Sequence, residues 1–274
     1  MQFKQPQIAV VIILYNPTEQ HLKHLSKIRT KAELIIVDNS SKEQEICLIN
    51  EYCYIPLKQN VGIAKAQNIG ISVAEEHGCS HVVFFDQDSE FDDTYIDSLL
   101  EEYEDIKISD PKIATLGPII VNKETNIEYK TDKTSNRVSS IISSGSIVEI
   151  SVFHKVGVYD SDLFVDLVDT EWCFRAISMG FSIYKSSKVL LYHMVGSKSK
   201  SVLGLPIIIS APTRYYYQYR NAIKLLRRNY VPYKWKIKMI VRKSFEFIYI
   251  PLISKDGGLV IRNMCKGIKD ALSL

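Results

Sequence analysis

Two carboxylates separated by one residue follow an apolar run in the first half of the chain. Asp86, Gln87 and Asp88 come directly after His81–Phe85, a run typical of a buried strand. Carboxylate oxygens are the ligands that Mg²⁺ and Mn²⁺ prefer, and such ions commonly bring a substrate diphosphate with them. An isolated pair of this kind more often marks a turn. Because two other strand ends are also polar, we favour a cation or ribose site here.

Those two polar strand ends lie nearer the N-terminus. Tyr15 and Asn16 follow Ile8–Leu14, and Asp38 closes Glu33–Val37. Asp38 can accept a hydrogen bond from a nucleobase N–H or a ribose hydroxyl, although Asp38-Asn39-Ser40 would also suit the start of a helix. Ligands of open α/β sheets bind beyond the carboxyl ends of the strands, so we expect these ends to form one nucleotide site.

Small residues recur at intervals of four in the next segment. Gly62, Ala66 and Gly70 would let a helix pack closely against another element, and packing alone explains this stripe. Further candidates for contacts to a diphosphate or a sugar in this segment are Asn60, Gly62, Lys65 and Asn68.

Residues 166–175 form a second cluster of ionisable side chains. A helix starting here would favour an ionised Asp169 through its dipole, and an ionised Asp near a hydroxyl can act as a general base. Glu171 and Arg175 are four residues apart and can pair with each other, so a salt-bridged helix start is the simpler alternative. His193 ends a later apolar run and would complete the coordination of a cation at Asp88 if the fold brings them together.

Alternating strand-like and helix-like segments would position these residues. Such alternation predicts a doubly wound α/β fold with a parallel sheet. The expected strands are 8–14, 33–37, 54–56, 81–85, an interrupted one at 141–150, and 182–192. The expected helices are 17–30, 41–52, 62–77, 92–103, 169–179, 215–228 and 234–248, with a loop or edge hairpin over 123–137. Neither GxGxxG nor GxxxxGK[ST] is present, which weighs against dinucleotide-binding dehydrogenases and P-loop proteins.

The composition indicates a globular chain. Of 274 residues, 46% are hydrophobic and 24% charged, and the longest apolar stretches, 8–15 and 247–253, are too short to span a bilayer. We interpret the N-terminal apolar run as a strand and not as a signal peptide. Five cysteines without zinc-site spacing indicate reduced thiols in a cytoplasmic protein.

The charge is distributed unevenly. Residues 1–213 carry a net charge of −8, whereas residues 214–274 carry 14 Lys and Arg against 3 Asp and Glu, a net charge of +11. We therefore expect a catalytic domain over 1–213 and a basic, aromatic helical extension over 214–274 that meets an anionic partner. Interleaved aromatic and basic side chains suit a membrane interface, and a soluble helical subdomain or a homo-oligomer contact is the alternative.

In chain order, these motifs resemble those of the family 2 inverting glycosyltransferases, which have a GT-A fold. The resemblance extends over about residues 7–225. More narrowly, the chain is similar to bacterial rhamnosyltransferases that build O-antigen or capsular polysaccharide. The motifs behind the narrower resemblance are Asp86-Gln87-Asp88-Ser89, Glu171-Trp172-Cys173-Phe174-Arg175 and Arg214-Tyr215-Tyr216-Tyr217-x-x-Arg220-Asn221.

The resemblance implies a role for each motif. The fold would be a mostly parallel, Rossmann-like sheet with helices on both faces, plus the C-terminal helical extension. Asp169 would be the catalytic base, although Val168 stands where the family has Glu, and Asp166 or Glu171 would be its substitute. Mg²⁺ or Mn²⁺ would bind Asp86, Asp88 and His193. The donor would contact Tyr15, Asn16, Asp38, Asn60, Gly62, Lys65, Asn68, Asp86, Gln87, Arg214 and Arg220. Support for the acceptor or the base would come from Gly145, Asp166, Glu171, Trp172 and Arg175.

The implied reaction moves L-rhamnose from dTDP-rhamnose to a hydroxyl of an oligosaccharide or a polyprenyl-diphosphate-linked saccharide. This would occur in the cytoplasm, at the inner face of the cell membrane. Hexosyl or galactofuranosyl transfer from a UDP-sugar is the alternative within the family. A nucleotidyltransferase would normally carry a Gly-rich basic loop after the first strand, which Leu14–Thr18 lacks. A nucleic-acid-binding module would leave the acidic strand ends without a role, so we expect no nucleic-acid partner.

Overall fold

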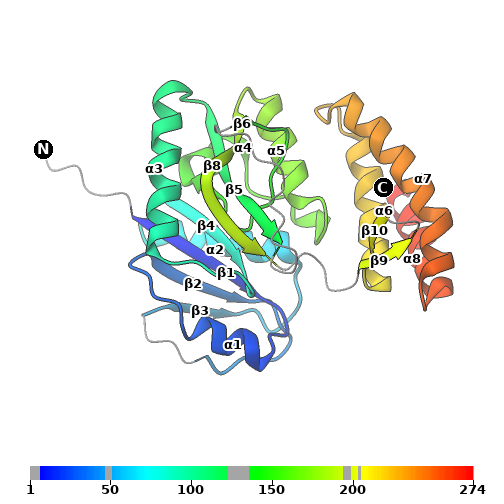
Figure 1. Ribbon diagram of the computed structural model, residues 1–274, viewed down its shortest axis with the longest axis horizontal. Coiled ribbons are helices and arrows are strands. Elements are labelled where there is room, and N and C mark those ends of the chain that lie inside the picture. The colour runs from blue at the N-terminus through cyan, green and yellow to red at the C-terminus, as the bar shows by residue number, and fades with distance from the viewer. Residues whose placement is uncertain (1–6, 47–50, 123–135, 194–198, 203–204, 274) are drawn as a thin grey trace, which may run out of the picture.

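The computed structural model describes residues 7–46, 51–122, 136–193, 199–202 and 205–273. A mixed sheet forms the centre of the larger part of the molecule (Figure 1), and its eight described strands lie in the order β3-β2-β1-β4-β7-β5-β8-β6. A bundle of helices, α6 to α8, lies beside the sheet-containing body.

Four neighbouring strands are parallel and end at the same edge of the sheet. They are β3 (Cys53–Pro56), β2 (Glu33–Asp38), β1 (Ile8–Leu14) and β4 (His81–Asp86). Leu14 is paired with Asp38, and Ile13 with Asp86, so the polar residues after these strands begin at one level. The predicted clustering of strand ends at one edge is therefore confirmed.

The other half of the sheet is mixed. β7 (Ile147–Glu149) runs antiparallel to both β4 and β5 (Ile113–Asn122). β8 (Ser182–His193) is parallel to β5, and the short edge strand β6 (Asn136–Arg137) is antiparallel to β8. The helices of this body are α1 (Glu19–Leu25), α2 (Ile63–Glu76), α3 (Asp93–Ser109), α4 (Ile150–Val156) and α5 (Val168–Ser178), with a 3₁₀ turn at Ser161–Leu163.

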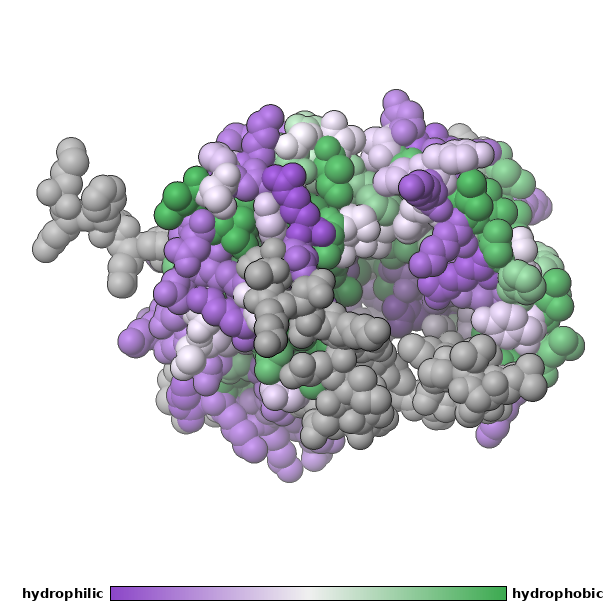
Figure 2. Space-filling model, turned by 45° about the horizontal axis from the view of Figure 1, so that its top comes forward, coloured by the Kyte–Doolittle hydropathy of each residue, from purple (hydrophilic) through white to green (hydrophobic). Residues whose placement is uncertain are grey.

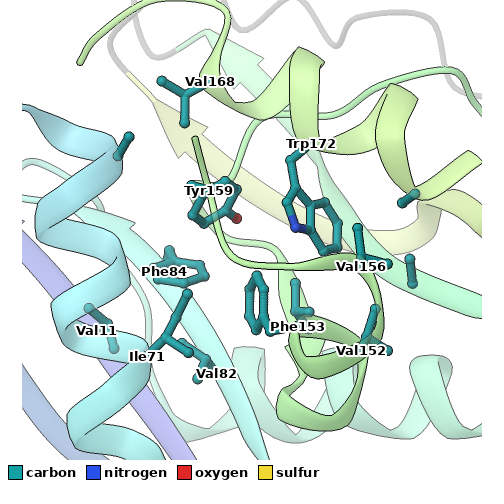
Figure 3. Packing of buried hydrophobic residues seen from close by; sticks show 14 of the residues in the cluster. Val11, Ile71, Val82, Phe84, Val152, Phe153, Val156, Tyr159, Val168 and Trp172 are labelled. Atoms are coloured by element: carbon teal, nitrogen blue, oxygen red, sulfur yellow. The ribbon is translucent and has the colours of Figure 1, made fainter. Parts of the chain in front are cut away.

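Alternate residues of the buried strands face two separate cores. Val11 and the other odd-numbered positions of β1 pack with α2, α4 and α5, and the even-numbered positions pack with α1 and α3. Gly70 shows how close α2 comes, because a Cβ at this position would lie 2.4 Å from Val11 Cγ1. Figure 3 shows the first core, where the Tyr159 ring lies 5.7 Å from Phe84 and 5.9 Å from Trp172 between ring centroids. Helices therefore cover both faces, as predicted.

The C-terminal part consists of a hairpin and three helices. The antiparallel strands β9 (Ser199–Val202) and β10 (Leu205–Ile208) precede α6 (Pro212–Arg227), α7 (Tyr233–Ile253) and α8 (Gly257–Leu272). α8 packs closely on α6, because a Cβ at Gly267 would lie 2.3 Å from the Tyr216 carbonyl oxygen. None of the helices in the described part of the chain combines the length and apolarity needed to cross a bilayer.

Several predicted elements are wrong. Described residues 41–46 and 51–52 are not helical, because the Gln44 N–H donates to the Tyr54 hydroxyl and the Gln44 amide to the Lys42 carbonyl instead of capping a helix. Residues 47–50 lie outside the description. Only 147–149 of the strand predicted at 141–150 are extended as a strand, and the helix predicted at 17–30 covers 19–25. β5, α4, β9, β10 and α8 were not predicted. Of the loop or edge hairpin predicted over 123–137, only β6 is described.

Candidate functional site

A pocket of about 580 Å³ opens at the carboxyl ends of β1, β2 and β4, next to the start of α6. The predicted site residues that line it are Tyr15, Asn60, Gly62, Asp86, Gln87, Asp88 and Arg214. Residues that we did not predict to contact the donor also line it, among them His21, Asn39, Phe164, Thr213 and Tyr217. The fold therefore brings together most of the residues expected to bind a nucleotide diphosphate.

Gln87 connects the ends of two strands at the floor of this pocket. Its Oε1 accepts from the Tyr15 N–H at 2.9 Å, and its Nε2 lies 3.1 Å from His21 Nδ1 on α1. The Asp86 N–H donates to the Ser144 hydroxyl at 3.3 Å. These bonds fix the backbone on which Asp86 and Asp88 project into the pocket, one on each side of Gln87.

Asp38 lies beneath the pocket and not in its wall. The residue is 1% exposed, and its two oxygens accept from the Ser40 N–H at 2.9 Å and from the Tyr54 hydroxyl at 2.7 Å. Burial, together with this carboxylate, raises the pKa of Tyr54 to about 12. Ser40 Oγ in turn accepts from the N–H of Asn16, a residue with φ of 45°. Asp38 and Asn16 thus shape the turn after the strands.

Asn39 occupies the position at the pocket wall that we expected for Asp38. Its Nδ2 donates to Asn60 Oδ1 at 3.0 Å, and its Oδ1 accepts from the Val61 N–H at 2.8 Å. Asn60 Oδ1 also accepts from the Gly62 N–H. The polar Asp38-Asn39-Ser40 motif could have identified Asn39 from the sequence. His21 lies in a segment with an ordinary helical pattern, which did not identify it as a site residue.

Gly62 is required where the pocket meets the segment before α5. It has φ of 84°, and a Cβ here would lie 2.6 Å from both Cδ2 and the carbonyl oxygen of Phe164. The Phe164 ring stacks on the Tyr217 ring of α6 with centroids 4.7 Å apart. Sheet, loop and helical extension therefore meet at this wall of the pocket.

The loop before α5 has an unfavourable backbone that α6 holds in place. Phe164, Asp166 and Leu167 have φ of 65°, 65° and 64°, in the left-handed region that non-glycine residues rarely adopt. The Asn221 side chain is fully buried, and its Nδ2 lies within hydrogen-bond distance of three loop carbonyls, those of Leu163 (2.8 Å), Val165 (2.7 Å) and Asp166 (2.9 Å). α6 thereby determines how the chain enters α5.

A guanidinium of α6 also binds this loop. Arg214 donates from Nη2 and Nε to the two carboxylate oxygens of Asp166, at 2.7 and 3.1 Å. The pKa of Arg214 is raised, first by the hydrogen bond to Asp166, and Asp86 adds to the effect. The pocket therefore has a positively charged guanidinium beside its carboxylates.

Asp169 lies at the start of α5 in a narrow crevice beside Ser143, Tyr159 and Trp172. Burial raises the pKa of Asp169 to about 6, Ser143 lowers it through its hydroxyl and its N–H, and the Asp86 and Asp166 carboxylates raise it. The sequence predicts an ionised Asp169 at the helix start. A carboxyl with a pKa of about 6 is largely ionised at neutral pH, which suits a general base.

Ser143 connects Asp169 to α2 and to the end of β4. Gln67 on α2 is 2% exposed, and its Nε2 donates to the Ser143 hydroxyl oxygen at 2.8 Å. Since a hydroxyl has only one proton, accepting from Gln67 directs that proton toward Asp169. Ser144, the next residue, holds the Asp86 backbone. The sequence contained no signal for Gln67 or for the role of Ser143.

Glu171, Trp172 and Arg175 lie outside the pocket and anchor α5. Glu171 is fully buried and pairs with Arg175 at 3.0 Å and with Arg228 at 2.7 Å. Arg175 also donates to the carbonyls of Val156, at the end of α4, and of Val158. Trp172 Nε1 donates to the Gly157 carbonyl at 2.7 Å. Glu171 is therefore occupied as a partner of two arginines and is not placed to substitute for the base.

Four further candidates lie outside the pocket. The Asn68 amide bonds the N–H and carbonyl of Tyr159 at 3.0 and 2.8 Å, joining α2 to the segment before the 3₁₀ turn. Arg220 donates to backbone carbonyls of that turn. Gly145 has φ of 75° and accepts from a buried tyrosine hydroxyl, and Lys65 is exposed on α2. Asn68, Arg220 and Gly145 therefore stabilise the fold around the pocket, and Lys65 does not line it.

The donor set for a cation consists of two carboxylates. Asp86 and Asp88 line the same pocket, which fits an Mg²⁺ or Mn²⁺ ion that takes its remaining ligands from a diphosphate and water. Over the described residues, no group of three or more His, Cys, Asp and Glu side chains is close enough to hold a metal. His193 ends β8 opposite Asn122, and its side chain lies outside the description.

Comparisons with known proteins agree with this geometry. Residues 9–148 match the model of the family Glycosyl transferase family 2. The chain is 36% identical over 265 residues to dTDP-rhamnosyl transferase RfbF of Shigella flexneri, covering 90% of this chain and 88% of the relative.

Two similar solved structures share the fold. S. aureus TarS 1-349 in complex with UDP-GlcNAc has a TM-score of 0.57 at 14% identity, covering 97% of this chain and 81% of that one. GalNAc-T7 with UDP, GalNAc and Mn²⁺ has a TM-score of 0.56 at 14% identity, covering 98% and 56%. The chain spans about half the length (49%) of a longer TarS structure that it also matches.

Proposed function

The chain belongs to Glycosyl transferase family 2, and we propose that it transfers L-rhamnose from dTDP-rhamnose to a sugar hydroxyl. It is a glycosyltransferase with a GT-A fold, as expected from the sequence. The choice of rhamnose is supported by the 36% identity to dTDP-rhamnosyl transferase RfbF across 90% of the chain. One observation carries the reaction: the Asp86 carboxylate, which lines the pocket, is close enough to raise the pKa of Asp169.

We place the donor's nucleotide diphosphate in the 580 Å³ pocket. Tyr15, Asn39 and Asn60 lie on the side formed by β1 and β2, where the nucleoside would bind. Asp38, buried below, would act on the nucleoside by fixing the turn that carries Asn39. Arg214 would pair with phosphate oxygens, since a guanidinium binds them bidentately. This would require it to share or release Asp166.

The transfer itself is a single displacement. Asp169 accepts the proton of the acceptor hydroxyl, whose oxygen bonds to the anomeric carbon from the face opposite the nucleotide. The bond between that carbon and the diphosphate oxygen breaks, and dTDP leaves with the electron pair. Attack from the opposite face inverts the anomeric configuration. Ser143 and Gln67 keep the Asp169 carboxylate oriented toward the acceptor.

Asp86 and Asp88 would hold the divalent cation, with His193 as the predicted third ligand. When bound, the cation stabilises negative charge on the leaving diphosphate as a Lewis acid. Both Mg²⁺ and Mn²⁺ accept such an oxygen-rich donor set.

The acceptor we propose is a saccharide linked to polyprenyl diphosphate, at the cytoplasmic face of the cell membrane. The basic extension, net charge +11, supports this location because it would meet anionic lipid headgroups. Transfer of another hexose or of galactofuranose from a UDP-sugar is the second candidate, since residues 9–148 fit the family as a whole.

Nucleotide release from a panel of donors tests the proposal. The donors are dTDP-rhamnose, UDP-glucose and UDP-galactose, each with Mg²⁺, with Mn²⁺ and with EDTA. We expect release from dTDP-rhamnose that EDTA abolishes. Turnover of a UDP-sugar without turnover of dTDP-rhamnose would replace rhamnose by the second candidate, and activity unchanged by EDTA would remove the cation from the proposal.

A further inference from the structure

The outward face of α7 carries a continuous stripe of exposed apolar side chains. They recur at the spacing of one helix face over Tyr233–Leu252, about 30 Å at 1.5 Å per residue. The stripe consists of Tyr233, Ile237, Ile240, Val241, Phe245, Ile248 and Leu252. The most exposed of these are Leu252 at 80% and Tyr233 at 75%. Figure 2 shows hydrophobic side chains along the outer edge of the helical bundle.

The opposite face of α7 already has its packing partners. Met239 and Ile250 are buried, and the Trp235 ring lies 5.4 Å from the Phe174 ring of α5. The acidic residue of α7, Glu246, is also buried, and it pairs with Arg242 at 2.7 Å and Lys243 at 2.6 Å. The stripe is thus an additional apolar surface, and exposed patches of this kind mark interaction sites.

The charges beside the stripe select its partner. Lys234, Lys238 and Arg242 are exposed on the same helix, and the extension as a whole has a net charge of +11. An apolar stripe with cationic residues matches the interface of an anionic bilayer, where apolar side chains enter the acyl boundary and cations face the headgroups. A second copy of this chain would bring two strongly positive surfaces together, which is unfavourable.

The loop before α5 lies on the opposite side of α7 from the stripe. A cavity of about 110 Å³ lies between α7 and Asp166, lined by Gln218, Met239, Arg242 and Lys243. Arg242 therefore lies both beside the stripe and at the rim of this cavity. A membrane lying against the stripe would therefore be separated by α7 from the loop that enters α5.

We propose that α7 lies in the plane of an anionic phospholipid surface, with its apolar stripe inserted below the headgroups, and that this contact holds the catalytic cleft beside a lipid-linked acceptor. The lipid contact follows from α7 itself, and only its purpose rests on the proposed function. A chain that transfers sugar in solution but does not bind lipid would refute this inference and leave the proposed transfer reaction intact.

Vesicle flotation tests the proposal with the full chain. One set of vesicles is phosphatidylcholine alone, and the other also contains roughly 30% phosphatidylglycerol, which makes the bilayer moderately anionic. We expect flotation with anionic vesicles that falls with added salt and is much weaker with neutral ones. The absence of flotation with anionic vesicles would overturn the proposal.

Two sets of variants sharpen the test. Replacing Phe245, Ile248 and Leu252 by Gln should reduce partitioning at least 10-fold, whereas Gln at Ile108, Val158 and Ile177, exposed apolar residues of the catalytic body, should leave it unchanged. Lys234→Gln with Lys238→Gln, which removes no packing, should reduce it about 5-fold per lysine. Wild-type flotation of the α7 variants overturns the proposal. The proposal is also overturned if the wild-type protein does not bind vesicles but forms a dimer that the apolar substitutions dissociate. The stripe would then be an interface between two copies of the chain.

Discussion

The cleft, formed by the 580 Å³ pocket and the crevice at Asp169, and the outer face of α7 are both unusual, but in different ways. In the cleft, carboxylates are held partly or fully away from water, and three non-glycine residues adopt left-handed backbone conformations. On α7, apolar side chains that would normally be buried face outward over some 20 residues. The first arrangement costs stability inside the molecule, and the second leaves apolar surface unburied.

The two regions also differ in how they are supported. Each unfavourable feature of the cleft has a matching partner: Asn221 for the left-handed loop, Arg214 for Asp166, and Ser143 for Asp169. The α7 stripe has no such partner within the described residues. Internal support indicates a site that works on a small molecule brought to it, whereas an unsupported apolar face indicates a partner outside the chain.

The largest effect should come from removing the proposed base inside the cleft. Asp169→Asn keeps the shape of the side chain but cannot accept the acceptor proton, so we expect kcat to fall about 10²–10⁴-fold. Donor binding, measured by calorimetry, should stay within a few-fold. Near-wild-type transfer by this variant would show that Asp169 is not the base.

The same variant should be more stable than the wild type at neutral pH without ligands. The pKa of Asp169 is about 6 in the folded chain, above the ordinary value of 3.8, so the folded state binds its proton more readily. Ionisation of Asp169 therefore costs stability above pH 6, and this cost disappears below the unfolded pKa. Asp169→Asn should gain on the order of 1–3 kcal/mol at pH 8 and little at pH 4, measured by urea unfolding. Equal changes at both pH values would contradict the raised pKa.

Glu171→Gln tests the anchor below the cleft. Two arginines would lose their buried anionic partner, and breaking such a pair by removing one member costs about 3–5 kcal/mol. We expect a lower midpoint of thermal unfolding with a nearly unchanged KM for the donor. Glu101→Gln, which removes an exposed pair with Lys188, is the matched control and should cost less than about 1 kcal/mol. A loss of kcat without a loss of stability would instead give Glu171 a role in catalysis.

Asn221→Leu tests whether α6 supports the strained loop. The substitution removes an amide that lies within hydrogen-bond distance of three loop carbonyls, of which only that of Leu163 has a second side-chain donor among the described residues, Arg220, so we expect a loss of about 1–3 kcal/mol. kcat should also fall at least 10-fold, because Asp166 lies in this loop and Asp169 follows it, and donor turnover measures that loss. Asn263→Leu on α8 is the control, since its amide bonds a carbonyl of its own helix on the exposed surface. Equal effects of the two substitutions would mean that the loop does not depend on Asn221.

The sequence was sufficient to predict features that depend on local patterns. The apolar runs with polar ends predicted β1, β2, β4 and the edge where they meet, because a parallel strand buried on both faces has a distinctive composition. The stripe of Gly62, Ala66 and Gly70 predicted close packing, which the contact of Gly70 with Val11 confirms.

Features that depend on distant partners were not predictable. Asp38 turned away from the pocket because Tyr54, on the neighbouring strand, supplies a hydroxyl to its carboxylate. Asn221 and Gln67 act on residues 55–58 and 76 positions away, so no local pattern identifies them. The helix predicted from Ser41 was wrong for the same reason, since the Gln44 N–H bonds a tyrosine of β3.

The smallest expected effect tests whether the Ser143 hydroxyl sets the pKa of Asp169. Ser143→Ala removes the hydroxyl that lowers the pKa of Asp169 but keeps the backbone N–H. The acidic limb of the kcat/KM profile should therefore move to higher pH, by about 0.5–1 unit, since a lost hydrogen bond to a carboxylate disfavours its charged form. Gln67→Leu should shift the limb in the same direction by less, because it only frees the Ser143 hydroxyl to rotate.

Other titratable groups close to Asp169 could also affect the pH profile, so each has to be considered. Asp86 and Asp166 raise its pKa, and Tyr159 and Cys173, whose pKa values burial raises, stay neutral over the range tested. The acidic limb is therefore expected to follow Asp169, whose pKa is about 6. Ser151→Ala, which removes a hydroxyl bound to Glu149 beside the opposite end of β4, should leave the limb unmoved. If Ser143→Ala reduces kcat at every pH without moving the limb, then Ser143 orients the carboxylate but does not set its pKa.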